Sequence, residues 1–84
     1  MARAPIPLTD LATDEEGAVI ELGGGRGLVS RLATLGFTPG APLKMVQNFG
    51  SGPLIVRVRD TRIALGRGEA GKVVVQRLRR SSHA

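Results

Sequence analysis

The sequence contains no cysteine, no tryptophan and no tyrosine, and it has only two phenylalanines and one histidine among 84 residues. Without cysteine, the chain can form neither disulfides nor thiolate metal sites. A chain of this length has room for one domain, because typical domains run to about 100 residues or more. We therefore expect a single small core built from aliphatic side chains.

Long hydrophobic runs are also missing. No stretch approaches the roughly 20 apolar residues that a membrane-spanning helix needs. Residues 1–7 hold one charge and two prolines, and no apolar run follows them as it would in a signal peptide. We therefore expect a soluble protein, or one held at a membrane only by a partner.

Residues suited to catalysis or metal binding are equally scarce. His83 lies in the last few residues, and the spacing indicates no serine–histidine pairing and no recessed pair of carboxylates. Asp14, Glu15 and Glu16 could offer oxygen ligands to a divalent cation, but carboxylates adjacent in sequence usually only solvate a surface. We therefore expect no enzyme activity, no cofactor, no small-molecule substrate and no stable site for iron or another transition metal.

The charge is basic and unevenly distributed. The net charge is +5, and from residue 22 onward 11 bases stand against 2 acids. Such an excess suggests an anionic partner, which could be an acidic protein surface, a nucleic acid or a membrane. Base-stacking platforms need several aromatic side chains, so the two phenylalanines make nucleic acid the weaker alternative.

The first third of the chain predicts a turn, a strand and a helix. Leu8 and Leu11 lie in a short turn or 3₁₀ segment within residues 4–16 and are placed to plug one end of a core. A strand over residues 18–22 puts Ala18, Ile20 and Leu22 on one face. A glycine-rich turn over residues 23–27 then leads into a helix.

The helix is predicted over residues 26–35. Leu28, Leu32 and Leu35 form one apolar stripe, which we expect to be core. Gly36 stands where a left-handed residue ends a helix, and Phe37 is placed to fold back onto the last turn. A turn over residues 38–41 follows, because proline and glycine occupy its two central positions.

The remainder predicts strands over residues 42–48, 53–59, 61–65 and 72–78, with a short helical turn around residue 70. Five short strands with close turns indicate a mainly β fold, a small closed barrel with one helix after its first strand. We expect one domain over residues 1–78 and a disordered tail over residues 79–84, which has nothing to bury.

Several short motifs occur in a characteristic order. They are Pro7-Leu8-Thr9-Asp10-Leu11, Leu35-Gly36-Phe37-Thr38-Pro39-Gly40, Gly52-Pro53-Leu54-Ile55-Val56-Arg57-Val58, Arg62-Ile63-Ala64-Leu65 and Ala70-Gly71-Lys72-Val73-Val74-Val75. Taken together over residues 8–78, this order resembles the FeoA family of ferrous iron transport proteins. The sequence departs from the family pattern at Arg59-Asp60, where many members carry a glycine-containing turn, and at Gly68.

The resemblance implies an SH3-like barrel and an accessory role in bacterial ferrous iron uptake. The implied partner is FeoB, a membrane permease with a GTPase domain, and the implied location is the cytoplasm, with the membrane reached only through that partner. The same module forms the C-terminal domain of some iron-dependent repressors, so a nucleic-acid-binding or metalloregulator-type module is the alternative.

We predict that the partner docks on the glycine-rich turn and the outward face of the helix. The residues of this predicted docking surface are Gly24, Arg26, Val29, Ser30, Arg31 and Phe49. Uncovered backbone N–H groups at the positive end of a helix favour carboxylates, and an arginine beside an apolar contact is a common interface composition.

Three alternatives remain open at this stage. The glycine cluster over residues 23–27 could hold a phosphate, although the P-loop pattern is absent. Phe49 could tuck back over the barrel end instead of standing exposed. The central hairpin presents Arg57, Arg59 and Arg62, with Arg67 just beyond. These arginines could form a simple soluble face, a docking face for an acidic protein surface or a contact with nucleic acid.

Overall fold

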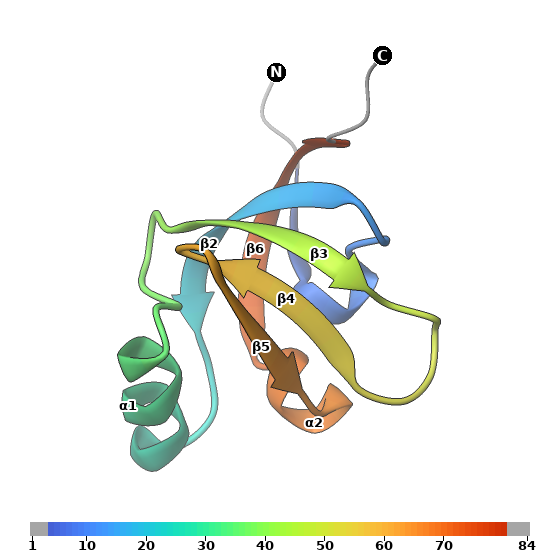
Figure 1. The fold of residues 1–84 in the computed structure, drawn as a ribbon. Helices are drawn as coiled ribbons and strands as arrows, with labels where there is room; N and C mark the ends of the chain where they lie inside the picture. The colour runs from blue at the N-terminus through green and yellow to red at the C-terminus, as the bar shows by residue number, and fades with distance from the viewer. Residues whose placement is uncertain (1–3, 81–84) are drawn as a thin grey trace.

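The computed structural model describes residues 4–80. Its six strands form one antiparallel sheet in the order β1-β6-β2-β3-β4-β5, which curls into a small barrel with both helices at one end (Figure 1). The elements are β1 (Pro5–Pro7), the 3₁₀ turn η1 (Leu8–Asp10), β2 (Glu15–Leu22), α1 (Arg26–Thr34), β3 (Pro42–Gln47), β4 (Leu54–Val58), β5 (Thr61–Leu65), α2 (Arg67–Ala70) and β6 (Val73–Arg80). The mainly β class predicted from the sequence is confirmed.

The sheet has one strand more than predicted, and its hydrogen-bonded ladder is not closed. Strand β1 pairs with β6, with Ile6 opposite Val75. This strand was not predicted, because Pro5 and Pro7 lack the N–H group that a central strand needs. Such prolines are tolerated only in an edge strand. Within residues 4–80, β1 and β5 therefore form the two edges of the sheet.

Strand β2 begins at Glu15, earlier than predicted, and contains an irregularity. Val19 pairs with Val75 and Glu21 with Val74, so Ile20 is an extra residue between two paired positions. Such a bulge interrupts the two-residue alternation of faces. The prediction of one shared face is therefore wrong in part: Leu22 packs against the core, whereas Ile20 is 36% exposed.

Helix α1 ends as predicted. Gly36 has φ +110°, and its N–H donates to the Ala33 carbonyl at 3.0 Å, while the Phe37 N–H donates to the Leu32 carbonyl at 3.0 Å. These two bonds form the Schellman motif, which satisfies carbonyl groups at the helix end. Phe37 is thereby turned back into the core, where it is fully buried.

Two tight turns shape the central hairpins. The Ala41 N–H donates to the Thr38 carbonyl at 2.9 Å, and Gly40 has φ +89°, as the predicted turn requires. Between β4 and β5, Arg59 and Asp60 have φ of +52° and +65°. Two consecutive positive φ values identify a two-residue type I′ hairpin turn, although neither residue is a glycine.

The short helix α2 matches the predicted helical turn, and β6 extends past its predicted end. The Glu69 carboxylate accepts a hydrogen bond from the Gly66 N–H at 3.4 Å, which caps α2. Strand β6 runs to Arg80, two residues beyond the prediction, because β2 begins early enough to pair with it. The predicted tail over residues 79–84 thus overlaps the strand, and residues 81–84 lie outside the described residues.

The core fills the barrel interior and is closed at one end by η1. Leu8 and Leu11 are fully buried there, as the sequence predicted. The other buried apolar residues are Val19, Leu32, Phe37, Ala41, Leu43, Met45, Leu54, Val56, Val58, Leu65, Ala70, Val73 and Val75. Within the part of the chain that the structure describes, no helix is long and apolar enough to cross a membrane.

Candidate protein-interaction surfaces

The glycine-rich turn before α1 has a backbone that requires glycine at one position. Gly24 has φ +90°, and a Cβ atom there would lie 2.8 Å from Cδ2 of Leu28. The Gly23 N–H is held by the Lys72 carbonyl at 2.6 Å, and Gly25 provides the N-cap without a side-chain hydrogen bond. The glycine-rich turn therefore fixes where α1 begins, but it provides no side-chain hydrogen bond to the N–H groups of the first helical turn.

The faces of α1 divide as the sequence predicted, except at its C-terminal end. Leu32 is fully buried and Leu28 packs against the core, but Leu35 is 37% exposed, so the expectation that all three leucines are core is wrong for Leu35. Gly36 ends the helix directly after Leu35, and the chain then turns Phe37 inward in its place.

The outward face of α1 contains most of the predicted docking residues. Arg26 and Ser30 are exposed, and Val29 is half-buried without packing against the core. Ser30 uses its backbone carbonyl to accept a bond from the Thr34 hydroxyl at 2.9 Å. A cation, a hydroxyl and an apolar side chain thus lie within little more than one helical turn.

Arg31 is less available than the sequence indicated. Its guanidinium forms an ion pair with Glu69, and the two side chains are 57% and 28% exposed. This pair joins α1 to α2, which are 38 positions apart in the chain. Arg31 is therefore partly neutralised and contributes to holding the two helices together.

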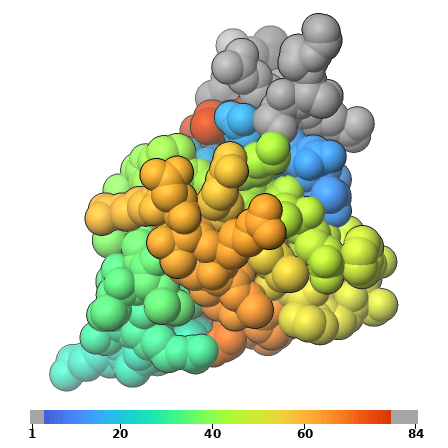
Figure 2. Space-filling view, in the orientation of Figure 1, coloured from blue at the N-terminus to red at the C-terminus, as the bar shows by residue number. Residues whose placement is uncertain are grey.

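Phe49 does not lie at the rim of the α1 surface. It lies in the β3–β4 loop, which Figure 1 shows on the opposite side of the molecule from α1. In Figure 2, side chains of the β5–α2 region separate the two surfaces. Phe49 is 76% exposed, so it does not tuck back over the barrel end, and the predicted docking residues form two surfaces instead of one.

Asn48 fixes the loop that carries Phe49, a role that the sequence pattern did not predict. Its Nδ2 donates to the carbonyls of Thr9 at 3.0 Å and Leu11 at 2.8 Å. Its Oδ1 accepts from the Gly50 N–H at 3.0 Å and from Nη2 of Arg67 at 2.5 Å. An asparagine two residues before a glycine in a loop was the available signal, since asparagine commonly bonds the backbone two residues on.

The central hairpin forms a third surface, which is basic. Cross-strand pairing places Lys44 of β3 opposite Arg57 of β4, and Arg57 opposite Arg62 of β5, so these three side chains form a row on one face of the sheet. Arg57 and Arg62 are exposed. Arg67 does not extend this row, because it is half-buried and bonds Asn48.

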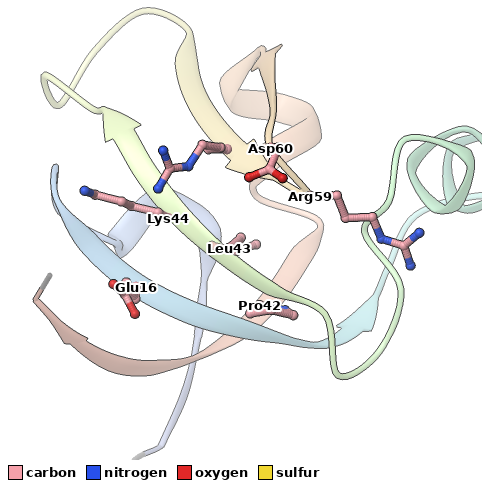
Figure 3. Close-up of a pocket in the computed structure, with 7 residues that line it drawn as sticks. Glu16, Pro42, Leu43, Lys44, Arg59 and Asp60 are labelled. Atoms are coloured by element: carbon pink, nitrogen blue, oxygen red, sulfur yellow. The ribbon is translucent and has the colours of Figure 1, made fainter.

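A shallow hollow of ≈ 330 Å³ opens beside the basic row (Figure 3). Its lining comprises Glu16, Pro42, Leu43, Lys44, Arg57, Arg59 and Asp60. Figure 3 shows Arg59 extending away from Lys44 and Glu16, so it lines one end of the hollow. The hollow combines both signs of charge, so it is a polar surface.

The acidic cluster of residues 14–16 is split by the structure. Glu15 is 7% exposed, forms an ion pair with Arg77 at 2.8 Å and accepts the Ala12 N–H at 2.7 Å. Glu16 instead lines the hollow. Within residues 4–80, no three His, Cys, Asp or Glu side chains come close enough together to hold a metal ion, and His83 lies outside that range.

Comparison with known proteins gives a consistent result. A sequence model of the FeoA domain matches residues 6–77. The chain is 36% identical over 70 residues, which is 83% of its length, to a Methanocaldococcus jannaschii protein named as an Fe(2+) transport protein A, of which the match covers 84%.

Solved structures agree in fold. The crystal structure of an iron uptake regulatory protein, FeoA, superposes with a TM-score of 0.84 at 33% identity, over 89% of this chain and 100% of that one. Stenotrophomonas maltophilia FeoA, crystallised with zinc and described as a prokaryotic SH3 domain protein, gives 0.76 at 33% identity, over 88% and 96%. The SH3-like fold expected from the sequence is therefore confirmed.

Part of a larger protein shares the fold as well. A manganese-dependent transcriptional repressor gives a TM-score of 0.81 at 16% identity, over 93% of this chain but only 44% of the repressor. At that identity the likeness shows the fold alone.

Proposed function

Because this chain belongs to the FeoA domain family, we propose that it is an accessory protein of ferrous iron uptake that acts in the cytoplasm by binding a FeoB-like permease. Family membership carries this proposal.

The surface that we propose for this contact is the outward face of α1 with the turn before it. Arg26 lies there without a carboxylate partner, since the ion pairs among the side chains of residues 4–78 are Arg31–Glu69 and Arg77–Glu15. Val29, which is half-buried and does not pack against the core, adds apolar area beside it. An unpaired arginine next to a half-buried apolar side chain has the composition of an interface hot spot.

Phe49 is a second contact in this proposal, on a separate part of the permease. The bonds of Asn48 hold the loop in one conformation, so the exposed ring is presented without a large loss of conformational entropy on binding. A partner that reached both Phe49 and α1 would have to span the α2 side of the molecule.

The variants Arg26→Glu and Val29→Asp test the α1 surface. We expect each to weaken binding to the intact permease by about 2 kcal/mol, roughly 30-fold, and to abolish support of iron uptake. The titration is run with and without guanine nucleotide, and circular dichroism and thermal melts must match the unaltered protein.

Arg62→Glu is the matched control, because it makes the same change of charge on a different face. Retained binding in this variant, with loss in Arg26→Glu, supports the α1 surface. The reverse pattern would move the contact to the basic row, and an unaltered protein that does not bind the permease would count against the function itself.

The runner-up function is a nucleic-acid-binding or metalloregulator-type module, which the basic row favours. Binding to nucleic acid would weaken steeply with salt, because it releases counterions. We expect no detectable binding to DNA or RNA at low ionic strength and no stoichiometric metal in the purified protein by elemental analysis.

A further inference from the structure

Strand β5 is one of the two edges of the sheet within residues 4–80, and β4 is the one strand that pairs with it there. The two-residue turn makes Val58 and Thr61 a hydrogen-bonded pair, and such pairs alternate along an antiparallel ladder. Arg62 and Ala64 therefore occupy the non-bonded positions. Their N–H and C=O groups point away from β4, so four backbone groups face outward.

This edge is open, whereas the other edge of the sheet is blocked. Arg62 and Ala64 are exposed, and no backbone hydrogen bond outside the β4–β5 ladder involves either residue. At the opposite edge, Pro5 and Pro7 of β1 have no N–H to offer. Proline and charge are two of the common ways of protecting an edge strand, and of these β5 has only the charge of Arg62.

The charges beside the open edge are those that the fold leaves unpaired. Lys44, Arg57 and Arg62 form the row that ends at β5, and within the described residues none of them forms an ion pair. The nearby acids are Glu16, which lies opposite Lys44 at the far end of the row, and Asp60 in the turn. The edge itself is therefore bordered by cations.

We propose that the outer edge of β5 binds an extended acidic segment of a partner protein by strand addition. The added strand would exchange backbone hydrogen bonds with Arg62 and Ala64, and its alternate carboxylates would face Arg62 and Arg57. This inference does not depend on the α1 surface or on the identity of the permease.

The chemistry of the edge favours this occupant over two others. A second copy of this chain would bring Arg57 and Arg62 of both copies together, and each copy has a net charge of +5. A nucleic acid backbone offers phosphate acceptors but few donors for the outward C=O groups. An acidic polypeptide satisfies the N–H groups, the C=O groups and the cations together.

A synthetic peptide of alternating glutamate and threonine serves as the probe, and one of alternating lysine and threonine is its control. In an NMR titration of the full chain, we expect the acidic peptide to shift the amide signals of β5 and to slow hydrogen exchange at Arg62 and Ala64. The amides of Thr61 and Ile63 already bond β4 and should change little. The basic peptide should not bind.

Two variants and one control locate the binding. Arg62→Glu should weaken it about tenfold or more. Ala64→Pro removes one outward N–H without removing a bond to β4, and it should weaken binding between about threefold and tenfold. Arg26→Glu makes the same charge change away from β5 and should leave the affinity unaltered.

Four results would overturn the proposal. They are the absence of binding at millimolar acidic peptide, equal affinity in Arg62→Glu, protection of Arg62 and Ala64 that grows with protein concentration alone, and tighter binding of a single-stranded oligonucleotide to the same edge. The third would identify a second copy as the occupant, and the fourth a nucleic acid. Because the probe is not the permease, each result is independent of the α1 experiment.

Discussion

Asn48 joins segments that are far apart in the sequence. One side chain bonds the carbonyls of Thr9 and Leu11, the N–H of Gly50 and the guanidinium of Arg67. The backbone N–H of Asn48 donates to the Thr13 hydroxyl at 2.9 Å. The β3–β4 loop is therefore held against η1 and α2 through a single residue. Because the loop is held in this way, the Phe49 ring stays exposed to solvent.

Replacing Asn48 by alanine should destabilise the protein by about 2–3 kcal/mol. The two carbonyls and Arg67 would lose their partners in a half-buried site, and leaving buried polar groups unsatisfied costs about that much. Urea denaturation measures the free energy of unfolding. Phe49→Ala is the adjacent control and should change it by less than about 0.5 kcal/mol, since the ring is exposed. Equal effects of the two variants would contradict the role assigned to Asn48.

At the scale of elements, the end of α1 decides how the helix meets the sheet. Gly36 lies against the hairpin, where a Cβ atom would be 3.1 Å from Cγ1 of Val58, and its φ is +110°. The same glycine permits the two hydrogen bonds that turn Phe37 into the core. Helix position and core packing thus depend on one backbone conformation.

Gly36→Ala and Gly27→Ala should have opposite effects on stability. The first forces a Cβ atom into a left-handed position beside Val58 and should cost about 1–3 kcal/mol. The second lies inside α1 with open space around it, and alanine there should stabilise by about 0.5–1 kcal/mol. Thermal melts of both variants show whether each change lowers or raises the Tm. A stabilising Gly36→Ala would mean that the helix ends differently in solution.

At the scale of the molecule, one core connects every element that carries a surface. The buried residues come from η1, α1, α2, all of the strands except β1 and the segments that follow η1 and α1, and they form one cluster. The α1 face, the Phe49 loop and the β5 edge therefore lie on elements that share one core.

Calorimetry should show one unfolding transition, with equal calorimetric and van't Hoff enthalpies, because a single core of this size unfolds as a unit. The expected enthalpy near 60 °C is about 0.7 kcal/mol per residue. Loss of signal from α1 before the sheet, seen by NMR during the same melt, would contradict a single domain over residues 1–78 and would show that the helix is a separate unit.

Local sequence determined the features that depend on a few neighbouring residues. The end of α1 at Gly36, the turn over residues 38–41 and the helical turn near Ala70 follow from backbone preferences of glycine and proline and from short periodic patterns. The family, and with it the fold, followed from the order of several such signals along the chain.

Only the tertiary structure decided what depends on pairing between distant segments. The bulge at Ile20, the ion pair of Arg31 with Glu69 and the separation of Phe49 from α1 all arise from which strands and helices become neighbours. The open edge of β5 is of the same kind, since a strand is an edge only by the absence of a neighbour. Periodicity reports which way a side chain points within its own element, but it contains no information about the element opposite.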